Sequence, residues 1–183
     1  AHVSRSLSTA LYIGMISSAS RSEFTFVSSS VLGAQTVFAA ADECERRGLM
    51  RLELTSSFPH YEGIRAEVLA ARQRGFQLLL HNYFPPPARG FVINLASENT
   101  EIRRRAVDHC LAGLELSAEI GAPYFSVHAG FALDPKPSEL GRPVATGGRR
   151  ALTDAGRSFV EVVARLCESA EALGVNLLIE NNV

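Results

Sequence analysis

The sequence predicts an α/β fold, an incomplete (β/α)8 barrel in which about five parallel strands alternate with helices. The first observation is the alternation itself. Short segments rich in leucine, aromatic or β-branched residues are separated by longer segments with apolar residues at helical spacing. The second is that a single glycine follows each helical segment: Gly48, Gly75, Gly121 and Gly174. The third is that helix-to-strand links are short, whereas the links after the third and fourth strands are long, as expected where functional loops follow the carboxyl ends of the strands.

The first half of the chain is expected to supply three strands and two helices. Residues 24–28 alternate and are rich in aromatic and β-branched residues, which favours a strand. A helix over 35–47 has its apolar residues on one face and leads to a strand over 49–54. A second helix over 61–74 leads to a third strand over 76–80.

The next unit begins with a proline run, 85–87, which is incompatible with a helix interior or a central strand. Asn99 or Thr100 is expected to cap a long helix over 101–120. A fourth strand is predicted over 124–127. The expected apolar stripe of the helix comprises Ile102, Val107, Leu111, Leu114 and Ala118.

A long loop over 129–150, rich in proline and glycine, separates this strand from the last helix. Thr153 or Asp154 is expected to start that helix, which runs to residue 173. A final strand lies within 175–183. Its run Leu177-Leu178-Ile179 is apolar on both faces, which predicts a strand buried between helical layers.

The bulk composition is that of one globular domain. The chain has 183 residues, 46% of them hydrophobic and 20% charged, and a net charge of −1. The balanced charge gives no overall electrostatic reason to expect nucleic acid or an anionic membrane as a partner. The three cysteines, Cys44, Cys110 and Cys167, fall in predicted helices without metal-type spacing, which indicates reduced thiols and a cytoplasmic protein. No apolar run reaches the length of a membrane-spanning helix.

The domain organisation is expected to be simple. Residues 1–21 form an N-terminal lead-in, and residues 22–183 form the N-terminal part of the barrel. The lead-in has a short apolar centre after Arg5, so a weak signal peptide is an alternative to a strand or an irregular segment.

Four residues that can bind metal lie at or near the ends of predicted strands: Glu53, His81, His128 and Glu180. In a barrel of parallel strands they would meet at one mouth. Glu180 ends an apolar strand, and a buried carboxylate is costly unless a cation, a metal or hydrogen bonds compensate it. Histidine and glutamate together suit Zn²⁺, Mn²⁺ or a similar ion. The alternative is that the histidines are structural and that Glu53 is salt-bridged or on the surface.

Other polar residues are given plainer interpretations. His109, in the middle of a predicted helix, is expected to have a packing or polar-surface role. Arg142, Arg149 and Arg150 could bind a phosphate, but a solvated loop is preferred. Residues 28–30, three serines, could contact a sugar or simply form a turn.

Four strand-end motifs occur in one order along the chain. They are Leu-Leu-His-Asn-Tyr over 79–83, Phe-Val-Ile-Asn-Leu-Ala-Ser over 91–97, Ser-Val-His-Ala-Gly over 126–130 and Leu-Ile-Glu-Asn-Asn over 178–182. Together they resemble the xylose-isomerase-like TIM-barrel superfamily. That superfamily holds sugar and sugar-phosphate isomerases and epimerases, and the endonuclease-IV-type AP endonucleases.

The resemblance implies a role for each matching residue. Glu180 would bind the metal and help to move a proton, with His128 as the second catalytic residue. His81 and His128 would be metal ligands in the endonuclease branch and would line the substrate pocket in the isomerase branch. His81, Glu53 and Asn182 are the predicted substrate-binding residues. The cofactor would be a divalent ion: Mn, Mg, Co or Zn. The remaining ligands of the superfamily come from strands six to eight, so we expect this chain to carry an incomplete metal centre.

The sequence leaves three hypotheses for the function. The first is a sugar or sugar-phosphate isomerase or epimerase that uses a divalent metal and carboxylate proton transfer, at least in a full-length form. The second is an endonuclease-IV-type, zinc-dependent DNA-repair enzyme, which the charge balance disfavours. The third is a truncated, non-catalytic barrel fragment. A small-molecule sugar is the expected partner, and a homo-oligomer is one way to cover the open edges of an incomplete barrel.

Overall fold

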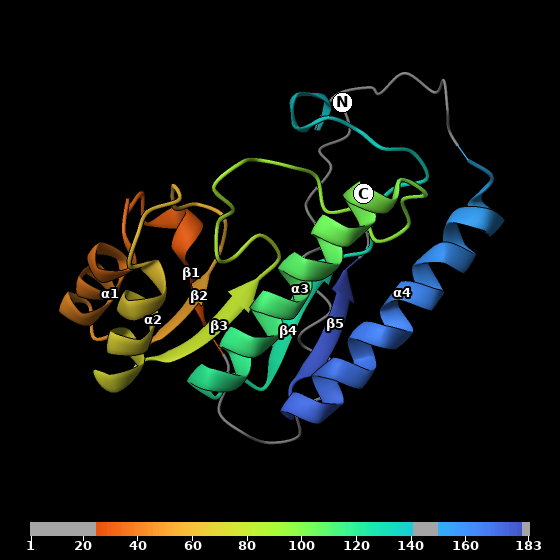
Figure 1. Ribbon diagram of the computed structural model, residues 1–183. Coiled ribbons are helices and arrows are strands. Elements are labelled where there is room, and N and C mark those ends of the chain that lie inside the picture. Colours follow the sequence, from red (N-terminus) through yellow and green to blue (C-terminus); the bar gives the residue numbers. More distant parts are fainter. Residues whose placement is uncertain (1–24, 141–149, 181–183) are drawn as a thin grey trace, which may run out of the picture.

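The predicted α/β fold is confirmed by a computed structural model, which describes residues 25–140 and 150–180. Five strands form one sheet in the order β1-β2-β3-β4-β5, and every neighbouring pair is parallel. Figure 1 shows the strict alternation of strands and helices. The elements are β1 (Val27–Ser28), α1 (Val37–Arg46), β2 (Arg51–Leu54), α2 (Ile64–Gln73), β3 (Gln77–His81), α3 (Thr100–Ile120), β4 (Tyr124–His128), α4 (Leu152–Leu173) and β5 (Asn176–Glu180).

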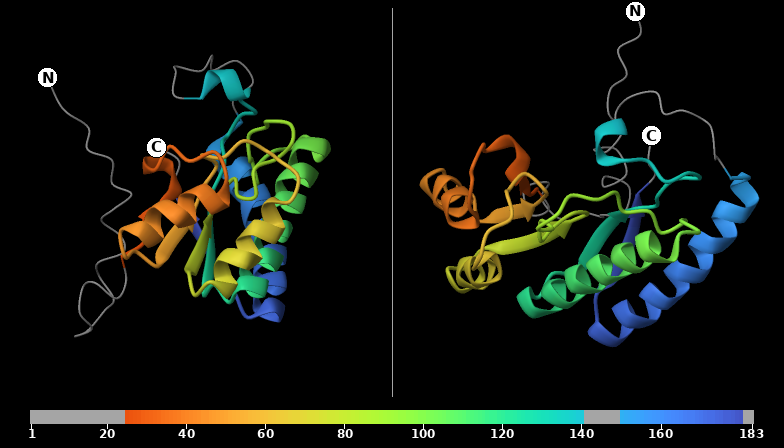
Figure 2. Two further views of the ribbon diagram at one scale, coloured as in Figure 1. Left: turned by 90° about the vertical axis from the view of Figure 1, so that its left-hand side faces the viewer. Right: turned by 45° about the horizontal axis from the view of Figure 1, so that its top comes forward.

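All four helices lie on one face of the sheet and follow its curvature, so the strands form the inner side of an arc (Figure 2). This is the arrangement of part of a (β/α)8 barrel. None of the helices within 25–140 and 150–180 combines the length and apolar character that a membrane span requires. The lead-in over 1–21 lies outside the described residues.

The hydrophobic core fills the space between the sheet and the helices. Strand residues alternate across the sheet: Leu52 and Leu54 are buried, whereas Glu53 between them is only half-buried. The alternation points the leucines toward the helices and the carboxylate toward the inner side of the arc. Phe125 on β4 is completely buried beneath α3.

The buried face of α3 differs from the predicted stripe. Leu114 is buried as predicted, but Val107 and Leu111 are only half-buried. The most deeply packed face consists largely of small residues: Ala106, Cys110, Gly113 and Ser117. Small side chains let the helix backbone approach the sheet closely. A Cβ added at Gly113 would lie 2.5 Å from the Phe125 ring.

The helix ends follow the sequence in part. Asn99 caps α3, because its side chain accepts hydrogen bonds from the backbone N–H groups of Glu101 and Ile102. Gly121 ends this helix in the left-handed conformation, as predicted. The start of α4 was predicted at Thr153 or Asp154, but its N-cap is Ala151, whose side chain cannot accept a hydrogen bond.

The prediction that β5 is buried on both faces is wrong for the described chain. Leu178 and Ile179 are each 37% exposed. Within the described residues β5 pairs with β4 alone and has one helix layer beside it, so an apolar run does not guarantee burial. Strand β1 is shorter than predicted, and residue 24 lies outside the described range.

Gly113→Ala is expected to lower the free energy of unfolding by about 1–3 kcal/mol, because the new methyl group overlaps the buried Phe125 ring. Gly156→Ala on α4 is the matched control, since a Cβ there meets nothing within 4 Å. Replacing a glycine inside a helix by alanine should raise the free energy of unfolding of this variant by about 0.5–1 kcal/mol. Urea unfolding followed by circular dichroism measures both. Equal shifts in the two variants would contradict the close contact between α3 and β4.

Candidate metal centre

Three strand ends bring His81, His128 and Glu180 together. They are the last residues of β3, β4 and β5. His128 is the register partner of Glu180, whereas His81 pairs with Ser126, two residues earlier on β4. The parallel register therefore sets all three at the carboxyl edge of the sheet.

The side chains of these residues form one cluster. His81 Nε2 lies 3.1 Å from Glu180 Oε1 and 3.2 Å from Oε2, and His128 Nε2 lies 3.7 Å from Oε2. One ligand atom from each residue can be chosen so that all three atoms lie within 4.8 Å of one another. The two imidazole rings meet edge to face, with centroids 5.7 Å apart. The cluster is half-buried, so it is both shielded and open to a small ligand.

Opposite charges dominate the pair His81–Glu180. Burial opposes a charge on His81, but the hydrogen bond to Glu180 and the charges of Glu180 and Glu53 outweigh it, so the pKa of His81 is raised. The hydrogen bond from His81 lowers the pKa of Glu180 against the effect of burial, and the charges of both histidines add to the lowering. The ion pair therefore stabilises the fold at pH values between the folded pKa of Glu180 and the folded pKa of His81. Its contribution is lost as pH falls through the folded pKa of Glu180 or rises through that of His81.

His128 and Glu53, the other two residues of the predicted set, have pKa shifts with different causes. Burial and the neighbouring His81 charge lower the pKa of His128 despite Glu180, so this imidazole is neutral at pH 7. Glu53 on β2 pairs in register with Leu79, two residues before His81, and is not part of the three-residue cluster. Burial raises the pKa of Glu53, the charge of His81 lowers it, and the charge of Glu180 raises it. Asn182 lies outside the described residues.

Asn94 joins the two long loops above the cluster. This buried residue follows β3, and its side-chain N–H donates to the Leu133 carbonyl at 2.9 Å and to Asp134 at 2.8 Å. Its side-chain oxygen accepts a hydrogen bond from the Phe131 backbone N–H at 2.9 Å. The Asn-Leu-Ala-Ser motif marked Asn94 in the sequence but gave it no role. The structure shows that it fixes the loop after β4 against the loop after β3.

Arg150 is neither a solvated arginine nor a free phosphate ligand. Its side chain is 15% exposed, donates to the Ala96 carbonyl at 2.5 Å and pairs with Glu98 at 2.9 Å. With Asn94 and Asp134 it lines a small polar cavity of about 120 Å³. Arg142 and Arg149 lie outside the described residues.

The three serines at the end of β1 and directly after it have structural partners. Ser29 is buried and hydrogen-bonds to Thr55 and Ser57 after β2, whereas Ser28 bonds to Ser30. These contacts fit turn formation between two strand ends.

The chemistry of the clustered donors fits a divalent transition metal. Two imidazole nitrogens and one carboxylate are a common ligand set for Zn²⁺, and also suit Mn²⁺ and Co²⁺. Mg²⁺ prefers oxygen ligands and waters, so this set suits it less well. The Nε2 atom of each histidine lies 3.1–3.7 Å from a Glu180 oxygen, and a metal bound between them would replace the proton that His81 and Glu180 share.

Part of a (β/α)8 barrel with histidine and glutamate at its strand ends defines the class of protein, and the family comparison agrees. Residues 34–182 match the model of the xylose isomerase-like TIM barrel family. The chain belongs to this family.

Several solved structures have a fold similar to that of this chain. A D-tagatose 3-epimerase-like protein has a TM-score of 0.61 and 17% identity; the match covers 85% of this chain and 51% of that chain. The 3-keto-D-glucoside 4-epimerase of E. coli has a TM-score of 0.61 and 14% identity, with coverages of 84% and 54%. A Thermus thermophilus protein, soaked with ZnCl₂, has a TM-score of 0.52 and 23% identity, with coverages of 77% and 50%. The chain thus spans about half the length of each structure. No curated protein matches it.

In the chelator-treated protein, Glu180→Gln is expected to lower the pKa of His81, because burial then acts without the bonded carboxylate and only the charge of Glu53 opposes it. Glu53→Gln is the matched control and should lower it less, since Glu53 acts through charge alone. NMR of the histidine ring protons against pH measures both. An unchanged His81 pKa in Glu180→Gln would show that the pair does not form in solution.

Proposed function

We propose that the protein binds one divalent metal ion through His81, His128 and Glu180, and that this site serves a sugar or sugar-phosphate isomerase or epimerase. The observation that carries the proposal is the convergence of these three strand-end residues, whose ligand atoms lie within 4.8 Å of one another. Family membership supports the reaction class. Two solved structures of similar fold are described as an epimerase and an epimerase-like protein, which suits the same class.

The protonation states suit this chemistry. The lowered pKa of Glu180 makes it an anion at neutral pH, able to bind a cation or to accept a proton from a carbon next to a carbonyl. Neutral His128 can coordinate, or can bond to a sugar hydroxyl. Glu53, also on the inner side, can bond to another hydroxyl. A bound divalent ion would supply polarisation of a substrate carbonyl or hydroxyl oxygen.

A second candidate is a metal-dependent phosphodiesterase of the endonuclease-IV type. One observation favours it: both histidines, not only the glutamate, offer a ligand atom to the cluster. The resemblance assigns both as ligands in that branch. The net charge of −1 and a single lysine, Lys136, give little support for DNA binding.

Two further proposals concern the setting of the protein. The free thiols Cys44 and Cys110 are buried in the core, which suits a reducing, cytoplasmic environment. The apolar side chains of Leu178 and Ile179 on β5 are partly exposed, and a second copy of the chain could cover them.

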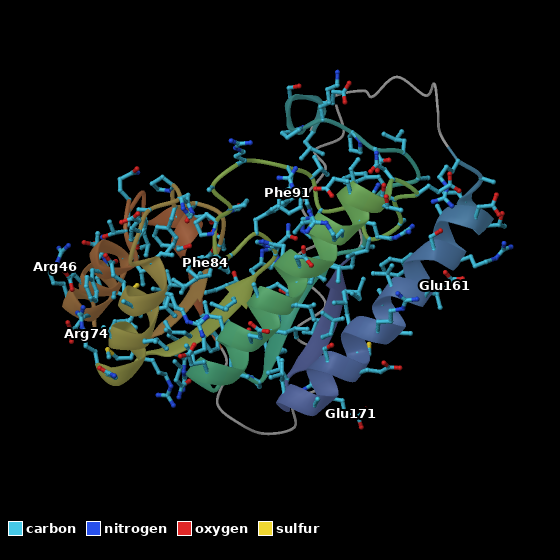
Figure 3. The ribbon with its side chains drawn as sticks, viewed as in Figure 1. Arg46, Arg74, Phe84, Phe91, Glu161 and Glu171 are labelled. Carbon is cyan, nitrogen blue, oxygen red and sulfur yellow. The ribbon has the colours of Figure 1, made fainter. Side chains whose placement is uncertain are left out.

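Glu180→Gln is expected to weaken Zn²⁺, Mn²⁺ or Co²⁺ binding by at least about a hundredfold, because loss of a mere outer-sphere partner already costs about 10–100-fold. Isothermal titration of the dialysed protein measures the affinity. Glu161→Gln is the control, since Glu161 is an exposed carboxylate on α4 (Figure 3). Equal affinities of wild type and Glu180→Gln would refute the metal site.

Metal-dependent exchange of deuterium from D₂O into the carbon next to the carbonyl of a ketohexose or its phosphate is the expected activity, measured by proton NMR. Glu180→Gln should abolish it, because the proton acceptor is lost, and Glu161→Gln should not change it. A parallel assay offers an oligonucleotide with an abasic site. Cleavage without exchange would replace the first function by the second. Metal binding without either activity would leave a binding module.

A further inference from the structure

Asn82, the residue directly after His81, has a constrained backbone. Its φ of 46° lies in the left-handed region, which is uncommon for a residue other than glycine and tolerated best by asparagine and aspartate. The residue is 5% exposed. Its conformation turns the chain away from β3 immediately beyond the candidate ligand.

Asn82 completes the last register pair of β3 and β4 through its backbone and continues the link through its side chain. The register between these strands runs only to His81 and Ser126, whereas β4 and β5 stay paired as far as His128 and Glu180. The Asn82 N–H donates to the Ser126 carbonyl at 2.7 Å, which is the hydrogen bond that closes the last pair. The Asn82 side-chain oxygen accepts the His128 N–H at 3.4 Å. One residue thus ties the backbones that carry both histidines.

His109 on α3 hydrogen-bonds to the backbone carbonyl of Asn82, the third polar group of Asn82 with a partner. Its Nε2 lies 3.0 Å from the Asn82 carbonyl oxygen, which can only accept, so Nε2 carries the proton. The ring packs against both Tyr83 and Phe91, with centroid distances of 6.0 Å and 5.7 Å, and these two rings also contact each other at 6.0 Å. Figure 3 labels Phe91 beside the N-terminal half of α3. Burial lowers the pKa of His109 despite the hydrogen bond to Asn82, which keeps the ring neutral and in one tautomer.

We propose that Asn82 and His109 are positioning residues of the metal centre. His109 fixes the left-handed backbone of Asn82, and Asn82 sets the separation of His81 and His128. The inference rests on the proposed metal site, although neither residue is among the three proposed ligands. It replaces the expectation that His109 serves packing or the polar surface alone.

The test is titration with Co²⁺ alone, followed by visible absorption, which reports both affinity and ligand geometry. Asn82→Gly keeps the left-handed backbone accessible but removes the side-chain acceptor, so Co²⁺ binding should weaken about 10–100-fold with a shifted spectrum. Asn82→Asp keeps an acceptor and tolerates the same backbone. Its Co²⁺ affinity should stay within about threefold of the wild-type value.

His109→Phe keeps an aromatic ring in the cluster with Tyr83 and Phe91 but removes the donor. It should weaken Co²⁺ binding about tenfold, and His109→Gln, which retains an N–H donor, should restore part of the loss. If the two residues act in one chain of contacts, the double variant Asn82→Gly/His109→Phe binds no more weakly than Asn82→Gly alone. If the losses of Co²⁺ affinity in the two single variants add in the double variant, the proposed chain of contacts is wrong. Thermal unfolding of each variant identifies a temperature at which all are folded for the titration.

The two levels of the proposal fail in different ways. If wild type does not bind Co²⁺, or Glu180→Gln binds it equally well, the metal site itself is wrong. If Glu180→Gln loses Co²⁺ while Asn82→Gly and His109→Phe keep the wild-type affinity and spectrum, the metal site stands and the positioning role is overturned. A loss of stability with an unchanged Co²⁺ spectrum would make both residues structural only.

Discussion

The register of β4 between its two neighbours is the constraint on which the candidate site depends. Successive side chains of a strand point to opposite faces, so a slip of one residue would turn His128 toward the helices. The register instead pairs His128 with Glu180 and leaves His81 beside Ser126. Curvature of the sheet then brings the ends of β3 and β5 into contact across β4. The arrangement is first a consequence of how three parallel strands align, and the proposed role of Asn82 is to set the separation of the two histidines within it.

Close packing of α3 is what keeps that register in place. Phe125 on β4 lies against the backbone of α3 at Gly113, and His109 lies one turn earlier on the same helix. The helix therefore contacts β4 through its core face and the turn after β3 through an imidazole. Burial of a large aromatic ring stabilises the layer by roughly 2 kcal/mol or more. The same contact that supports the core also supports the strand ends.

Local patterns in the sequence predicted the elements and the three strand-end residues. Alternation, a glycine after each helix and a histidine at the carboxyl end of a strand can all be recognised within a short segment. They did not predict the small-residue face of α3. A search for large apolar side chains passes over Ala106 and Gly113, whose value is the space that they leave. The exposure of Leu178 was missed because an apolar run does not reveal how many neighbours its strand has.

The role of Asn82 was beyond local patterns for another reason. Its partners Ser126 and His109 lie far away in the sequence, and its left-handed backbone is selected by those contacts rather than by its immediate neighbours. Arg150 was misinterpreted similarly. A loop arginine in a glycine-rich stretch suggests a solvated side chain, but the carbonyl of Ala96 and the carboxylate of Glu98 hold it against another loop.

The link between Asn94 and the loop after β4 divides the carboxyl side of the molecule into two parts that are held by different contacts. The first part, which we call the floor, consists of the strand ends and the helix α3 behind them. The backbone register of the strands holds the candidate ligands there. The walls are two long loops joined to each other through Asn94. Substitutions on the outer surface of these walls can reshape what enters without moving the floor. Under the proposed function, exchange of these loops would change which ligand enters while the candidate metal ligands keep their places.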